Sequence, residues 1–204
     1  NRCRRQRQMC IRDSYSTVRT IRSIEQSDVC LLLIDAQNGM ERQDQAIFWQ
    51  VVNSYRGVVI LVNKWDLIEK DHQTMKTFEA AICERIAPFT DVPILFTSNL
   101  TKQRILKAFE EAMEVYENRN YKIPTSQLND FLLPIIQNQP PPMYKGKMVR
   151  IKYVTQIKSQ TPTFAFYCNL PQYIKDPYKR FLENHIRSEW DLSGVTIRLF
   201  FREK

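Results

Sequence analysis

The chain has 204 residues, of which 43% are hydrophobic, 25% charged and 11% aromatic, a composition typical of a globular protein with a buried core. Its longest apolar runs, residues 29–34 and 58–62, are too short for a membrane span, and no secretory signal pattern lies near the start, so we expect a cytoplasmic protein without membrane contacts. The formal net charge of +8 is uneven, with +6 over residues 1–22, −5 over residues 23–142 and +7 over residues 143–204, which indicates either a phosphate-rich partner or a solvated basic surface.

Strand and helix patterns alternate in the first part of the chain. Wholly apolar runs at residues 29–34 and 58–62, with a weaker one at 93–97, predict strands covered on both faces. Helical periodicity between and after them predicts helices over residues 44–54, 75–86 and 103–116. This order is typical of a parallel sheet with flanking helices in an α/β domain, which binds ligands at the carboxyl ends of its strands.

The pattern changes after three consecutive prolines at residues 140–142. Alternation of apolar and polar residues predicts strands over residues 149–153, 164–166 and 195–199, and helical spacing predicts a helix over residues 177–186. We therefore expect a small α+β domain over residues 143–204, a connecting helix and Pro-rich linker over residues 123–142, and the α/β part over residues 1–122.

Several kinds of site are excluded by residue types. Five scattered cysteines without a C-x-x-C pair and two isolated histidines argue against a metal site, a disulfide framework or a catalytic triad. The four glycines all lie more than ten residues apart, so the sequence holds neither G-x-x-x-x-G-K-[ST] nor G-x-G-x-x-G. We expect no catalytic residue and no tightly bound cofactor in these 204 residues.

One motif carries recognition chemistry. Asn63, Lys64 and Asp66 form an N-K-x-D sequence directly after the run 58–62, where a parallel strand ends. A carboxylate at that place can accept two hydrogen bonds from the ring N–H and exocyclic amine of guanine, and adenine does not present this pair of donors. Asn63 can bond the purine edge and tie loops together, while the stem of Lys64 can lie over the base. Ser98 and Asn99 end the third predicted strand, where a second loop could close over the base.

The order of many motifs resembles the second GTPase domain and the KH-like domain of the Der (EngA) family. In the first part these are Tyr15-Ser16-x-x-Arg19, Ile24-Glu25-x-Ser27-Asp28-Val29, Asp35-Ala36-x-x-Gly39, Gln43-Asp44, residues 62–67 and residues 115–118. In the second part these are the three prolines, Lys145-Gly146-Lys147, Thr155-Gln156, residues 162–164, residues 178–184 and residues 201–204.

The resemblance implies a P-loop-GTPase-type sheet that is incomplete here, followed by a KH-like domain. It also implies a function in assembly of the large ribosomal subunit, with guanine recognition by Asn63, Lys64 and Asp66 and base closure by Ser98 and Asn99. The family has Ser-Ala at the second loop, where this chain has Ser98 and Asn99. Family members use GTP or GDP with Mg²⁺, but the phosphate loop, first switch and D-x-x-G of that domain are absent from these residues, so we expect very weak GTP binding and no hydrolysis.

The basic second part suggests RNA as its partner. No G-x-x-G loop is possible with this glycine spacing, so we expect salt-sensitive contacts to ribosomal RNA made by basic side chains. The candidates are Lys145, Lys147, Arg150, Lys152, Lys158, Lys175, Lys179 and Arg180. Two interpretations remain open: a segment of a ribosome-assembly GTPase whose upstream GTPase domain supplies the catalytic parts, or a nucleotide-independent RNA-binding or scaffold protein.

Overall fold

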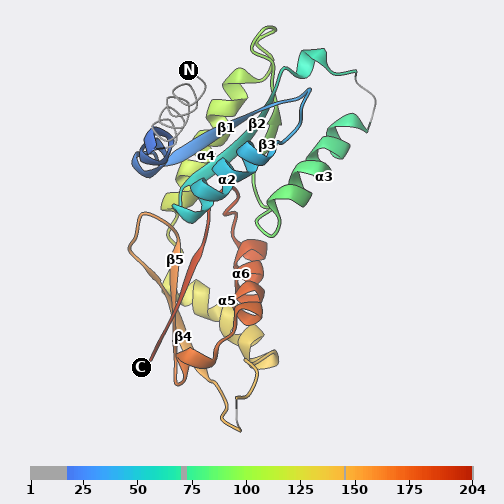
Figure 1. The fold of residues 1–204 in the computed structure, drawn as a ribbon. Coiled ribbons are helices and arrows are strands. Elements are labelled where there is room, and N and C mark those ends of the chain that lie inside the picture. The colour runs from blue at the N-terminus through green and yellow to red at the C-terminus, as the bar shows by residue number, and fades with distance from the viewer. Residues whose placement is uncertain (1–17, 70–72, 145, 204) are drawn as a thin grey trace, which may run out of the picture. The chain divides into compact units, whose positions relative to one another are not determined.

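The computed structural model describes residues 18–69, 73–144 and 146–203. The chain divides into two compact units, Asn1–Met113 and Glu114–Lys204 (Figure 1). None of the helices within the described residues is long and apolar enough to cross a membrane. Each unit has its own sheet and its own hydrophobic core.

The first unit is built on three parallel strands in the order β1-β2-β3. They are β1 (Val29–Asp35), β2 (Gly57–Asn63) and β3 (Ile94–Phe96). The central strand β2 is buried over its first six residues because it is apolar on both faces. The predicted α/β class with a parallel sheet is thereby confirmed.

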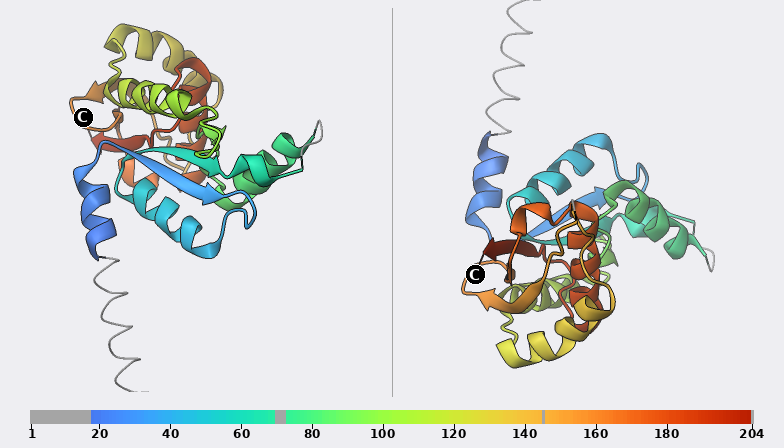
Figure 2. Two further views of the ribbon diagram at one scale, coloured as in Figure 1. Left: turned by 90° about the horizontal axis from the view of Figure 1, so that it is seen from above. Right: turned by 90° about the horizontal axis from the view of Figure 1, so that it is seen from below.

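Helices lie on both sides of this sheet, with α2 on one side and the first part of α4 on the other (Figures 1 and 2). They are a helix covering residues 18–26, α2 (Arg42–Asn53), the short η1 (Trp65–Leu67), α3 (Thr74–Ile86) and α4 (Ile105–Asn120). A capping box begins α2, where the Glu41 N–H donates to Asp44 Oδ2 at 2.9 Å. Phe48 then points from α2 into the core and is fully buried.

The buried face of α4 differs from the expected one. The sequence period aligns Phe109 and Tyr116 on the apolar face, but these side chains are 59% and 43% exposed, so that expectation was wrong. The buried positions are Ala108 and Val115, at 4% and 1% exposure. Apolar residues occur on more than one side of this helix, and the period alone does not select which side the core covers.

The second unit is a three-stranded sheet with helices, as expected for a small α+β domain. Its elements are α5 (Thr125–Asn138), β4 (Ile151–Ile157), β5 (Thr163–Cys168), the short η2 (Pro171–Tyr173), α6 (Asp176–Glu189) and β6 (Arg198–Glu203). β4 pairs antiparallel with β5, and β5 pairs parallel with β6 through the crossover that contains α6. Helices α5 and α6 share one core with the sheet residues that face them (Figure 1).

Two side chains fasten the chain before and within α5 to strand β4. Asn129 accepts the Val154 N–H at 2.8 Å and donates to the Val154 carbonyl at 2.8 Å, as a neighbouring strand would do. Gln156 accepts the Ile123 N–H at 2.7 Å and donates to the Tyr121 carbonyl at 2.8 Å. Because these amides satisfy backbone groups of β4 and of the segment before α5, they fix that segment against the sheet.

Candidate functional site

The carboxyl ends of the three parallel strands meet at one edge of the first unit. Asp35, the last residue of β1, is in register with Asn63, the last residue of β2. The Ala36 N–H donates to the Asn63 carbonyl at 2.9 Å, and the Thr97 N–H donates to the Val62 carbonyl at 2.8 Å. These bonds hold the loops after all three strands together at the edge where such sheets bind ligands.

The loop after β2 is anchored by its tryptophan, which packs in the core. Lys64 has a left-handed backbone (φ 61°, ψ 31°), and this turn sends the next residue, Trp65, back into the core. Trp65 is 3% exposed, with its ring centroid 4.3 Å from Phe96 and 5.2 Å from Phe78. The Trp65 backbone N–H donates to the Thr97 carbonyl at 3.1 Å. The two residues beside Trp65 are therefore positioned by packing.

Asp66 follows this anchor and remains accessible. Its side chain is half-buried, and among the residues that the structure describes its carboxylate has neither an ion-pair nor a hydrogen-bond partner. Its oxygens are not among the buried side-chain atoms without a partner, and no described residue holds the carboxylate in a salt bridge. Both of its oxygens are available to accept hydrogen bonds from a ligand.

The Lys64 side chain contacts Asp35, which the sequence analysis did not place in the site. Its ammonium Nζ lies 2.6 Å from Asp35 Oδ2, and the side chain is 52% exposed. The hydrogen bond from Lys64, aided by the Gln37 backbone N–H, lowers the pKa of Asp35 below its usual value. Asp35 ends an apolar run, as Asn63 does, and this shared position at a strand end was the sequence signal that could have placed it at the same edge.

The two predicted residues of the loop after β3 have different roles. The Asn99 N–H donates to Asn63 Oδ1 at 3.3 Å, so the structure brings these two predicted residues together. Ser98 is fully buried, its N–H donates to the Gln103 carbonyl at 3.3 Å, and its Oγ accepts the Thr101 N–H at 3.2 Å. Ser98 thus shapes the turn, and Asn99 is the residue of this loop that reaches the N-K-x-D segment.

The predicted RNA-binding residues that the structure describes fall in two parts of the second unit. Lys147, Arg150, Lys152 and Lys158 lie before, within or just after β4 and are exposed, whereas Lys175, Lys179 and Arg180 lie at or within the start of α6. Lys145 lies outside the described residues. The Lys179 ammonium is 2.8 Å from Asp176, whose pKa it lowers by donating a hydrogen bond, so part of its charge is compensated.

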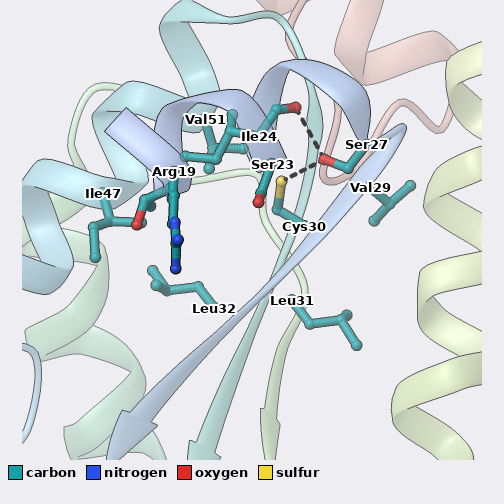
Figure 3. Close-up of a pocket in the computed structure, with 11 residues that line it drawn as sticks. Arg19, Ser23, Ile24, Ser27, Val29, Cys30, Leu31, Leu32, Ile47 and Val51 are labelled. Carbon is teal, nitrogen blue, oxygen red and sulfur yellow. Dashed lines mark hydrogen bonds between the residues drawn. The ribbon is translucent and has the colours of Figure 1, made fainter. Parts of the chain in front are cut away.

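A cavity of about 460 Å³ lies elsewhere in the first unit, between the helix over residues 18–26 and strand β1 (Figure 3). It is lined mainly by apolar side chains, and Ser27 Oγ beside it contacts Cys30 Sγ at 3.1 Å and donates to the Ile24 carbonyl at 3.0 Å (Figure 3). None of the predicted guanine-binding residues lines this cavity. It is separate from the edge that carries the candidate site.

The fold and the strand-end loops are those of a GTP-binding domain, and comparison with protein families agrees. The family model of the elongation factor Tu GTP-binding domain matches residues 15–136, and the chain belongs to this class. A second model, described as the KH-domain-like C-terminal part of EngA bacterial GTPase enzymes, matches residues 122–202. Within the class, the chain belongs to the Der (EngA) family of GTPases.

Curated relatives are similar over almost the whole chain. The protein named GTPase Der from Flavobacterium psychrophilum is 57% identical over 190 residues, which are 93% of this chain and 44% of that protein. GTPase Der from Bacteroides fragilis is 57% identical over 192 residues, with the same two shares of 93% and 44%. The chain therefore spans less than half the length of the curated relatives it matches.

A solved structure is also similar, though distantly. It is a crystal structure of a variant of Era from Aquifex aeolicus bound to GDP.AlF4⁻, with 16% sequence identity and a TM-score of 0.41. The similarity covers 90% of this chain and 68% of that chain. A likeness of this degree carries no argument about the site.

Proposed function

We propose that this chain is the guanine-nucleotide-binding segment of a GTPase that acts in large-subunit ribosome assembly in the bacterial cytoplasm. It corresponds to the distal part of the second GTPase domain followed by the KH-like domain. The upstream GTPase domain and the large ribosomal subunit are its proposed partners. Family membership and the lengths of the relatives support this assignment.

The observation that carries the nucleotide proposal is the accessible Asp66 carboxylate without a described partner, beside Asn63 at the end of β2. Its two oxygens match the paired ring N–H and amino donors of guanine. The stem of Lys64 is accessible for packing on the base, because the side chain is half exposed while its ammonium is turned to Asp35. Asn63 accepts the Asn99 N–H at 3.3 Å and so links the loop after β2 to the loop after β3 beside the proposed base site.

The residues present fit the base, but the sequence supplies no phosphate loop for the triphosphate and no matching residues for Mg²⁺. Charge-assisted hydrogen bonds to phosphate contribute about 1.5 to 3 kcal/mol each, and base contacts do not replace several of them. We infer that the 204-residue chain binds guanine nucleotides weakly and does not hydrolyse GTP. Steady release of phosphate from GTP by the purified chain would overturn this inference.

Saturation-transfer NMR suits the weak binding expected of base contacts alone. We expect the chain to show transfer to guanosine and not to adenosine, and Asp66→Asn to lose the guanosine signal. The asparagine amide would instead match xanthine, which presents a carbonyl where guanine has its amino group, so a xanthosine signal should appear.

Glu69→Gln is the matched control, because Glu69 is an exposed carboxylate three residues from Asp66 and its substitution removes the same charge. This variant should keep the preference for guanosine. Equal signals from guanosine and adenosine in the unsubstituted chain, or an unchanged preference in Asp66→Asn, would contradict base recognition by Asp66.

RNA binding by the second unit is the other part of the proposal. Residues 143–204 carry a formal charge of +7, and six of the eight proposed contacts, Lys147, Arg150, Lys152, Lys158, Lys175 and Arg180, are exposed. The affinity for a labelled ribosomal RNA fragment should fall steeply between about 50 and 200 mM salt as counterions compete. An affinity that does not change with salt would argue against these contacts, and an affinity independent of Asp66 substitutions would agree with the scaffold alternative.

A further inference from the structure

The three-stranded sheet of the second unit has one face that its core does not use. Strand register aligns the residues of this face, here called the open face, in three rows across β4, β5 and β6. The rows are Tyr153-Tyr167-Arg202, Thr155-Ala165-Phe200 and Ile157-Thr163-Arg198. None of these nine residues belongs to the buried core cluster that α5 and α6 form with the sheet.

Aromatic rings and arginines dominate the accessible part of the open face. The rings of Tyr153 and Tyr167 stack with centroids 4.4 Å apart and planes 14° apart. In the next row Phe200 is 38% exposed, and the guanidinium carbon of Arg198 lies 5.1 Å from the centre of its ring. Arg202 is exposed, whereas Thr163 and Ala165 in the central strand are buried.

The open face carries positive charge and no negative charge. The nine positions of the open face include two arginines and no acidic residue. The acidic residues of β6 and α6 lie elsewhere, with Glu203 on the alternate face of β6 and Asp176, Glu183 and Glu189 on α6. A face that combines arginines with ring surfaces complements a chain of phosphates and bases.

A basic cavity adjoins the third row. Ile157 lines a cavity of about 370 Å³ together with Arg119, Lys122 and Lys158. The Arg119 side chain is 3% exposed, and none of the nine described residues that line this cavity is acidic. The positive surface of the open face therefore continues past the end of β4 into a hollow.

We propose that single-stranded RNA binds along the open face, with bases stacked on the Tyr153-Tyr167 pair and on Phe200. Phosphates contact Arg202 and Arg198, and the strand continues towards the cavity that Lys158 and Lys122 border. This inference deepens the proposed RNA-binding function and rests on it. It assigns contacts to aromatic residues and to Arg198 and Arg202, none of which is among the RNA-binding candidates drawn from the sequence.

Fluorescence anisotropy of a labelled single-stranded uridine oligomer with the full 204-residue chain tests this. Loss of one stacked base corresponds to about 1 to 3 kcal/mol, so Phe200→Leu should weaken binding by about fivefold or more. Phe200→Tyr keeps an aromatic ring and should retain binding within about twofold. Arg202→Gln should weaken binding and reduce the slope of log affinity against log salt by about 0.7.

Matched controls come from exposed residues that belong neither to the open face nor to the other proposed RNA contacts. Phe109→Leu removes an exposed ring from α4, and Arg42→Gln removes one charge from α2. Both should bind within about twofold of the unsubstituted chain. Circular dichroism of each variant verifies that the fold is retained, and the Phe200→Tyr rescue separates loss of stacking from loss of structure.

The outcomes separate this inference from the function on which it rests. If the unsubstituted chain binds RNA but Phe200→Leu and Arg202→Gln bind as the controls do, the open face is not the RNA site and the general proposal stands. If the unsubstituted chain binds no single-stranded RNA even at low salt, this inference falls, and the separate measurement with a ribosomal RNA fragment decides the general proposal. Equal losses in Arg202→Gln and Arg42→Gln would indicate binding by overall charge and would also overturn this inference.

Discussion

Asn129 offers a sharp test of how the second unit is held together. Its side-chain amide makes two 2.8 Å hydrogen bonds to the backbone N–H and carbonyl of Val154, a residue that is fully buried. In Asn129→Ala both backbone groups lose their partners and water does not reach them easily. A cost of about 1 to 3 kcal/mol for each of the two backbone groups left without a partner gives an expected destabilisation of roughly 2 to 6 kcal/mol.

Urea unfolding followed by tryptophan fluorescence measures this change, because one of the three tryptophans, Trp190, has its ring centroid 5.3 Å from that of Phe131 on α5. Amide hydrogen exchange at Val154 should accelerate in the same variant. Asn120→Ala is the matched control, since it removes one exposed hydrogen bond at 2.8 Å to Tyr116 and should cost less than about 0.5 kcal/mol. Unchanged exchange at Val154, or equal losses in the two variants, would refute the reasoning.

Three further predictions concern burial and titration. Trp65→Ala should destabilise the first unit by about 3 to 5 kcal/mol in urea unfolding, with Trp65→Phe less harmful, and a loss below about 1 kcal/mol would contradict its role as an anchor. Burial raises the pKa of Tyr178 from 10.0 to about 12. The neutral phenol therefore contributes to the free energy of unfolding below about pH 10, and this contribution is lost as the pH rises to about 12. Tyr178→Phe should reduce that alkaline loss of stability in unfolding experiments at several pH values. The hydrogen bond from Lys64 lowers the pKa of Asp35, so the pair stabilises the fold above the ordinary carboxylate pKa and this contribution is lost as the pH falls through the lowered value. Asp35→Asn should remove this dependence of stability on acidic pH. An identical curve of unfolding free energy against pH in the variant would argue against the pair.

Much of the first unit could be predicted because its strands are locally distinctive. The run over β2 is apolar at almost every position, which only a strand covered on both faces requires, and the N-K-x-D letters follow directly. Local sequence patterns gave the wrong strand bounds where contacts with residues distant in the sequence decide the structure. The last strand begins at Arg198 and not at residue 195, because Val195 and Ile197 are buried before pairing with β5 starts.

The site shows the same limit. Asn63, Lys64 and Asp66 were evident from their order, but the bond between Lys64 and Asp35 spans 29 residues and appears only once β1 and β2 are in register. From the sequence, Ser98 and Asn99 were both expected to close over the base. Their different roles follow from Gln103, which takes the backbone of Ser98 into a turn and leaves Asn99 to meet Asn63.

The burial of Trp65 between Lys64 and Asp66 has a consequence for how damage to the protein would appear. The two side chains proposed to contact the base flank an indole that packs on Phe96 and Phe78, so loosening of the hydrophobic interior shifts both at once. On the proposed assignment, a mild core defect would reduce the preference for guanine over adenine while the sheet still forms. The proposed recognition would then respond to interior order before unfolding becomes measurable.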